Sequence, residues 1–241
     1  MDVAFVYFDI DDTLLDHRHA ERAALADVRT RYLETFGRYS VDELQTLYHT
    51  INAPLWRQYA QGAIDKTDVK DQRFVKLLEA VEAPHADAAR VGSYYMQRYG
   101  AHWRFVPGAH TAFEAIAQRY PVGLLTNGFA EVQAQKLKQF PVLAERAQAV
   151  IISEETGYMK PHPEVFAQAS AAAETPPERI LYVGDSFPSD VQGGQRAGWR
   201  VAWYLRDEPP KDATTDARGF AFTSWATLRE RLGLPAAESA A

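Results

Sequence analysis

The chain has 241 residues, of which 46% are apolar and 24% are charged, a balance expected of a globular protein with one large or two modest domains. Its net charge of −6, without a basic stripe along any predicted helix, argues against binding of a nucleic acid polymer. Cysteine is absent, which excludes disulfides and thiolate metal sites, and neither a membrane span of roughly 18 apolar residues nor a signal peptide is recognisable, so we expect a cytoplasmic protein that does not enter a membrane.

The first predicted element is a buried strand over 3–10, which runs directly into the acidic segment DIDD. The following 90 residues read as helix throughout, with a helix stop at Gly37 and a capping box formed by Ser40 and Glu43. Further helical patterns lie near 65–82 and 86–102. We therefore expect an all-helical cap domain at 16–104, inserted into a core domain made of 1–15 and 105–241.

The rest of the chain alternates between strands and helices, starting with a helix near 108–119. Apolar runs without polar alternation predict strands that are covered on both faces. The predicted strands are 121–127, 149–154, 179–186 and 200–205, and the predicted helices are 129–139, 163–174, 188–197 and 225–232, the last one capped by Ser224. We expect a loop over 207–219 and a frayed tail from 234 onward. This βαβ order predicts an α/β fold with a doubly wound parallel sheet.

Acidic residues follow the first and the fourth predicted strands, in the segments DIDD and GDSFPSD. In a doubly wound sheet the chain builds outward from the first strand and then returns to build the other side, which leaves a ligand-binding crevice at the carboxyl ends of two neighbouring strands. If the fourth strand lies beside the first, both acidic segments meet in this crevice. Carboxylates that gather there need a cation, and Mg²⁺ prefers oxygen ligands.

Asp9 and Asp11 are two residues apart in an extended segment, so we expect both side chains on one face and Asp12 facing away as a solvated turn or cap residue. A calcium loop that starts at Asp9 would need glycine at its sixth position and glutamate at its twelfth, where Leu14 and Ala20 stand. A calcium loop is therefore excluded.

The other candidate residues lie at the ends of later strands. Asp185 is expected to bind the metal, whereas Asp190 either binds it or caps the helix that follows. Thr126 ends the second strand in LLTNG, where a hydroxyl and the backbone N–H groups of Asn127 and Gly128 could hold a phosphoryl group.

Lys160, in GYMKPHP, would balance the carboxylates.

Taken together and in this order, these motifs resemble the haloacid dehalogenase-like (HAD) hydrolase superfamily, whose members are mostly phosphatases. The resemblance spans most of the chain, and the helical insert sits where the family carries its C1 cap. The segments LLTNGF, KPHPEVF and GDSFPSDVQGGQRAG, together with Trp56 and Arg73 in the cap, resemble the branch that contains pyrimidine 5′-nucleotidases and related TNG phosphatases.

The resemblance implies a Mg²⁺-dependent phosphomonoesterase that acts through an aspartyl-phosphate on a small phosphate ester, above all a nucleoside 5′-monophosphate. It implies that Asp9 is the nucleophile and Asp11 the general acid and base. It also implies Mg²⁺ ligation by Asp9, Asp185 and the backbone carbonyl of Asp11, with Asp190 orienting a metal-bound water or Lys160. By the same resemblance, Lys160 and Thr126 contact the phosphoryl group, and Trp56 and Arg73 contact the substrate.

Other functions stay open at this point. The substrate could be a sugar phosphate or sialic acid 9-phosphate, because the cap selects it. A 2-haloacid dehalogenase needs no proton for its leaving group, so Asp11 argues for phosphate, and a phosphomutase is a weaker alternative. A phosphoacceptor signalling module would carry an aspartate after the third strand, where this chain has ISEE.

Overall fold

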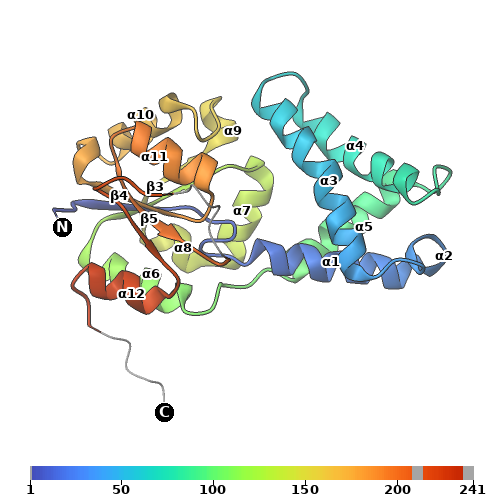
Figure 1. Ribbon diagram of the computed structural model, residues 1–241, viewed down its shortest axis with the longest axis horizontal. Helices are drawn as coiled ribbons and strands as arrows, with labels where there is room; N and C mark the ends of the chain where they lie inside the picture. Colours follow the sequence, from blue (N-terminus) through green and yellow to red (C-terminus); the bar gives the residue numbers. More distant parts are fainter. Residues whose placement is uncertain (1, 208–213, 236–241) are drawn as a thin grey trace, which may run out of the picture. The chain divides into compact units, whose positions relative to one another are not determined.

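The computed structural model describes residues 2–207 and 214–235, which divide into two compact units (Figure 1). The first unit combines Met1–Asp16 with Phe105–Ala241, and the second is His17–Arg104. Six residues of the loop expected at 207–219, and most of the tail expected to fray, lie outside the described residues. Within the described part of the chain, no helix is long and apolar enough to cross a membrane.

The first unit is built on a parallel six-stranded sheet in the order β3-β2-β1-β4-β5-β6. The strands are β1 (Phe5–Phe8), β2 (Val122–Thr126), β3 (Ala147–Ile152), β4 (Ile180–Gly184), β5 (Arg200–Tyr204) and β6 (Phe220–Phe222). The order reverses between β1 and β4, which confirms the predicted doubly wound fold. The sixth strand was not predicted, because three residues are too few to show a pattern.

Both faces of the sheet are covered, as the uninterrupted apolar strands indicated. Successive side chains of a strand point to opposite faces, so Val6 and Phe8 join one core cluster and Phe5 and Tyr7 join another. The first cluster includes residues of α6 (Ala109–Arg119) and α12 (Trp225–Arg231), and the second includes residues of α10 (Pro163–Ala172). Figure 1 shows these helices on opposite sides of the sheet.

The remaining helical elements of this unit connect the strands along the chain. They are α7 (Ala130–Gln139), α8 (Pro141–Arg146), α9 (Ser153–Thr156), the 3₁₀ turn η1 (Pro177–Arg179), the π-helical turn η2 (Phe187–Val191) and α11 (Gln192–Arg196). Two predictions need correction here. The strand expected over 149–154 ends at Ile152, because α9 starts at Ser153, and the helix expected over 188–197 is divided between η2 and α11.

The second unit is entirely helical within 17–104. Its helices are α1 (His17–Arg31), α2 (Leu33–Phe36), α3 (Val41–Ala60), α4 (Lys66–Ala80) and α5 (Ala88–Ala101). The capping box of Ser40 and Glu43 is present at the start of α3, as predicted. The helix expected to continue to Gly37 is interrupted at Tyr32, so that α2 is a separate turn.

Candidate active site

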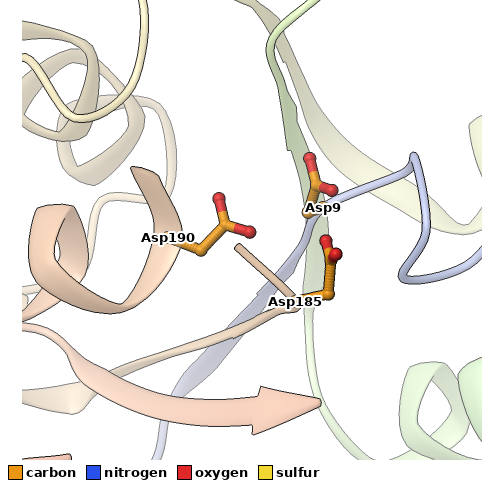
Figure 2. A group of neighbouring side chains, drawn as sticks. All are labelled: Asp9, Asp185 and Asp190. Carbon is orange, nitrogen blue, oxygen red and sulfur yellow. The ribbon is translucent and has the colours of Figure 1, made fainter. Parts of the chain in front are cut away.

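The carboxylates of Asp9 and Asp185 meet because their strands are neighbours. β1 and β4 pair in parallel with Phe8 opposite Val183, so the residues that follow both strands leave the sheet at the same edge. The N–H of Asp9 donates to the carbonyl of Val183 over 2.9 Å and fixes this register one residue further. Figure 2 shows the two side chains together with Asp190, and one carboxylate oxygen of each of the three lies within 4.8 Å of the others.

Asp190 comes from η2 and is completely buried. Its Oδ2 accepts from the N–H of Ser186 over 3.0 Å, and its carboxylate faces the other two rather than capping α11, whose N-cap is Val191. Gly184 makes this approach possible, because a Cβ there would lie 2.5 Å from Asp190 Oδ2. The π-helical turn and the glycine therefore bring the third carboxylate to the end of β4.

Lys160 lies between two of these carboxylates and is 5% exposed. Its Nζ donates to Asp9 Oδ1 over 2.7 Å, to Asp190 Oδ1 over 2.8 Å and to the hydroxyl of Tyr182 over 2.5 Å. The side chain of Asn127 bonds both the N–H and the carbonyl of Lys160, over 2.8 and 2.9 Å. Asn127 thus fixes the backbone that delivers the ammonium group.

The cluster holds more negative charge than Lys160 neutralises. Burial raises the pKa of Asp9 to about 7, with Asp190 adding to the rise, even though Lys160 acts in the opposite direction. Burial, Asp190 and Asp9 together hold the pKa of Asp185 well above its ordinary value. Burial alone would lower the pKa of Lys160, but Asp190 and Asp9 outweigh it and raise this pKa. Two buried carboxylates and the partly buried Asp185 carry up to three negative charges against the single positive charge of Lys160, so the net charge of the cluster favours binding of a divalent cation.

Asp11 is not one of the three carboxylates that lie within 4.8 Å of one another. Its Oδ2 accepts from Nε2 of Gln133 over 2.9 Å, and its Oδ1 accepts from Nζ of Lys136 over 2.5 Å. Both partners belong to α7 and are buried. Neither residue is recognisable as a site residue from the sequence, because their contact with Asp11 joins segments more than a hundred residues apart.

Asp12 lies in a turn, as expected, but the expectation that it is solvated was wrong, because it is only 9% exposed. Its Oδ1 accepts from Arg206 over 2.6 Å, and the same guanidinium donates to Asp16 Oδ1 over 2.7 Å. Asp12 has a φ of 59°, a left-handed conformation that aspartate tolerates better than most residues. Arg206 follows β5 and was not singled out from the sequence.

Thr126 and Gly128 flank Asn127 at the end of β2. The hydroxyl of Thr126 is completely buried and has no hydrogen-bond partner among the residues that the structure describes, which suits a group that receives a ligand. A Cβ at Gly128 would lie 2.3 Å from Nε2 of Gln133, so only glycine leaves room for the contact between Gln133 and Asp11.

The two candidate residues of the cap belong to the helical unit. Trp56 lies on α3 and is half-buried, with its ring 5.8 Å from that of Tyr59. Arg73 lies on α4, is 7% exposed and donates to the hydroxyl of Tyr48 and the sulfur of Met96. These contacts are internal to the unit, and substrate binding by Trp56 and Arg73 stays a prediction.

A family model described as haloacid dehalogenase-like hydrolase matches residues 4–198. The chain belongs to this family. HAD-hydrolase YfnB of Bacillus subtilis is 30% identical over 207 residues, which cover 84% of each chain. Pyrimidine 5′-nucleotidase YjjG of Escherichia coli is 27% identical, with 88% of this chain and 91% of YjjG covered, and pyrimidine 5′-nucleotidase PynA of Streptococcus pneumoniae is 30% identical, with 83% of each covered.

The fold is shared as well. The crystal structure of YfnB bound to magnesium superposes with a TM-score of 0.80 and 26% identity, covering 97% of this chain and 100% of YfnB. The resemblance inferred from the motifs, including the likeness to pyrimidine 5′-nucleotidases, is therefore confirmed at the level of the family and its named members.

Proposed function

We propose that this HAD hydrolase is a Mg²⁺-dependent phosphomonoesterase that works through an aspartyl-phosphate on Asp9. The observation that carries the proposal is the cluster of Asp9, Asp185, Asp190 and Lys160 at the switch point of the sheet, in which only Asp185 is partly exposed. A buried carboxylate whose pKa is raised, in a crevice beside a fixed ammonium group, is typical of a reactive centre. The names of YjjG and PynA support phosphate esters as substrates.

The residues present fit a magnesium ion. Oxygen ligands from three carboxylates converge, and their charge exceeds that of Lys160. Asp9, Asp185 and the backbone carbonyl of Asp11 would hold the ion, and Asp190 would either bind it or orient its water and Lys160. When bound, the ion supplies positive charge that offsets the repulsion between a carboxylate and a phosphate.

In the first half-reaction a carboxylate oxygen of Asp9 attacks phosphorus, and the bond from phosphorus to the leaving oxygen breaks. Asp11 donates the proton that the leaving alcohol needs. In the second half-reaction Asp11 takes a proton from water, whose oxygen attacks phosphorus and releases phosphate, so that Asp9 is restored as a carboxylate. Lys160 and the hydroxyl of Thr126 hold phosphoryl oxygens, assisted by the N–H groups of Asn127 and Gly128.

For the substrate we propose a nucleoside 5′-monophosphate, with a pyrimidine base as the first candidate. YjjG and PynA, whose names specify this class, cover most of the chain. The helical unit holds seven of the twelve tyrosines of the chain, and Trp56 could stack on a base. We propose that this unit acts as the cap that selects the substrate, with Arg73 as a second contact.

The proposal is tested by assaying the purified protein against a panel of nucleotides, sugar phosphates, sialic acid 9-phosphate and a 2-haloacid, with Mg²⁺ or with excess chelator. Hydrolysis should need Mg²⁺ and should fall by several orders of magnitude in Asp9→Asn, whereas the exposed control Asp2→Asn should keep full activity. Full activity in chelator or in Asp9→Asn contradicts the mechanism. Faster turnover of a sugar phosphate than of any nucleotide contradicts only the substrate assignment.

A further inference from the structure

The inner face of α7 is polar, which is unusual for a helix that packs against a core. Its two buried residues are Gln133 and Lys136, each 1% exposed. They are three positions apart and therefore lie on the same side of the helix. Burying an amide and an ammonium group costs free energy that apolar side chains at these positions would avoid. This cost calls for a reason other than stability.

Both side chains are directed to one carboxylate. Gln133 donates to Oδ2 of Asp11 and Lys136 donates to Oδ1, so the two oxygens are held from two points one helical turn apart. The amide of Gln133 is oriented by this contact, since its Oε1 is buried without a partner within the described residues. Gly128, the glycine of the TNG motif, provides the space that Gln133 occupies.

The helix that carries the two residues is itself anchored. The N–H of Ala130, at the start of α7, donates to Oε2 of Glu154 on α9 over 2.5 Å. A carboxylate at a helix N-terminus is favourable for the free N–H groups there. The position of Asp11 is thus connected to the ends of β2 and β3 through short, specific contacts.

We propose that Gln133 and Lys136 are positioning residues that hold the carboxylate of Asp11 and set where it delivers and accepts its proton. This inference rests on the proposed function, because it assigns the acid and base role to Asp11. It goes beyond that function by naming the residues that orient the acid, neither of which lies in the four motifs DIDD, LLTNG, GYMKPHP and GDSFPSD.

Kinetics with two leaving groups test the inference. In Lys136→Met and Gln133→Leu, kcat for an alkyl phosphate such as a nucleoside 5′-monophosphate should fall about ten- to a hundredfold, because a misplaced acid loses part of the 10²–10⁴-fold that such catalysis contributes. KM should change less than about twofold. Formation of the phospho-enzyme from p-nitrophenyl phosphate should slow less, since nitrophenolate leaves without a proton. Lys138→Met and Gln135→Leu, which alter exposed residues of the same helix, should match the wild type.

A double-mutant cycle separates positioning of Asp11 from an independent role. If Lys136 acts through Asp11, Lys136→Met should not slow turnover further once Asp11→Asn is present. The near-isosteric Gln133→Glu should be more harmful than Gln133→Leu, because it places a carboxylate against Asp11. Equal slowing of phospho-enzyme formation with both leaving groups, or a loss from Lys136→Met that persists undiminished in Asp11→Asn, overturns the inference.

A double-mutant cycle measured by unfolding tests the contact between Lys136 and Asp11 without any activity. It therefore stays decisive if the wild type hydrolyses no phosphate ester, a result that would refute only the proposed function. Urea unfolding midpoints are compared for the wild type, Asp11→Asn, Lys136→Met and the double variant. The changes in midpoint should not add, because Lys136→Met should be less damaging when Asp11 has already been made neutral. Lys136→Gln serves as the second variant if Lys136→Met does not fold. Additive midpoints would show that Lys136 does not hold Asp11.

Discussion

Magnesium should stabilise this protein far more at pH 8 than at pH 5. The pKa of Asp9 is about 7 in the folded protein against an ordinary value of 3.8, chiefly because the carboxyl group is buried. The folded state therefore holds this proton more tightly than the unfolded state does. The stability that protonation contributes is present at low pH and is lost as the pH rises from about 4 to about 7. Asp185, whose pKa is also raised, adds a loss of the same sign.

The size of the effect follows from these two values. A tenfold change in proton affinity corresponds to ~1.4 kcal/mol, so Asp9 alone should lower the free energy of unfolding by about 2–3 kcal/mol between pH 5 and pH 8. A bound divalent cation replaces the proton as the source of positive charge and removes this loss. For a protein of this size the difference corresponds to roughly 5–10 °C in melting temperature.

The assay is thermal unfolding at both pH values, with excess chelator and with saturating Mg²⁺. At each pH, the groups remote from the cluster titrate alike with chelator and with Mg²⁺. The increase in melting temperature caused by Mg²⁺, compared between pH 8 and pH 5, therefore reports the titration of the cluster alone. Asp9→Asn removes the group and should reduce the loss of stability between pH 5 and pH 8 in chelator, leaving the contribution of Asp185. An increase in melting temperature with Mg²⁺ that is equal at both pH values, or larger at pH 5, would refute the reasoning.

Three further changes probe the groups around the cluster. Lys160→Met removes the ammonium group from two buried carboxylates and should cost about 3–5 kcal/mol in chelator at pH 8, partly recovered with Mg²⁺, as measured by urea unfolding. Arg206→Met leaves two aspartates without this partner and should cost about 1–3 kcal/mol in thermal unfolding, whereas loss of the exposed Arg196 should cost less than about 0.5 kcal/mol. Gly184→Ala places a Cβ against the carboxylate of Asp190 and displaces it, so the affinity for Mg²⁺, measured by calorimetry, should fall about tenfold. An unchanged affinity would show that Asp190 does not contribute to binding of the ion.

The sheet could be predicted from the sequence because buried parallel strands leave a plain signal. Uninterrupted apolar runs such as ILYVG at 180–184 mark strands covered on both faces, and the helices between them require parallel pairing. The local details depended on contacts that the pattern does not contain. The π-helical turn at 187–191 interrupts an otherwise helical segment where Asp190 turns toward Lys160. Residues 220–222 form strand β6 because they pair with β5, and this pairing cannot be read from three residues of sequence.

The acidic cluster could be predicted for a topological reason. Residues that directly follow neighbouring parallel strands must leave the sheet together, so Asp9 and Asp185 needed only the correct strand order. Arg206 gave no such signal, because its partner Asp12 is 194 positions away and either residue alone resembles a solvated surface charge. The error for Asp12 came from judging a charged residue by its neighbours in sequence.

Helix α7 shows most clearly where a sequence pattern and a site diverge. At 3.6 residues per turn, Gln133 and Lys136 lie between Val132 and Leu137 around the helix, so polar side chains occupy the buried centre of a face whose apolar edges are only partly buried. Leu137 is only partly buried against the core, so the helix forgoes burial of apolar surface to bring an amide and an ammonium group to Asp11. Departures from local preference are expected where function outweighs stability. A buried polar face on a helix beside a predicted catalytic acid is therefore itself a signal, and it directs mutagenesis to α7 as well as to the four motifs.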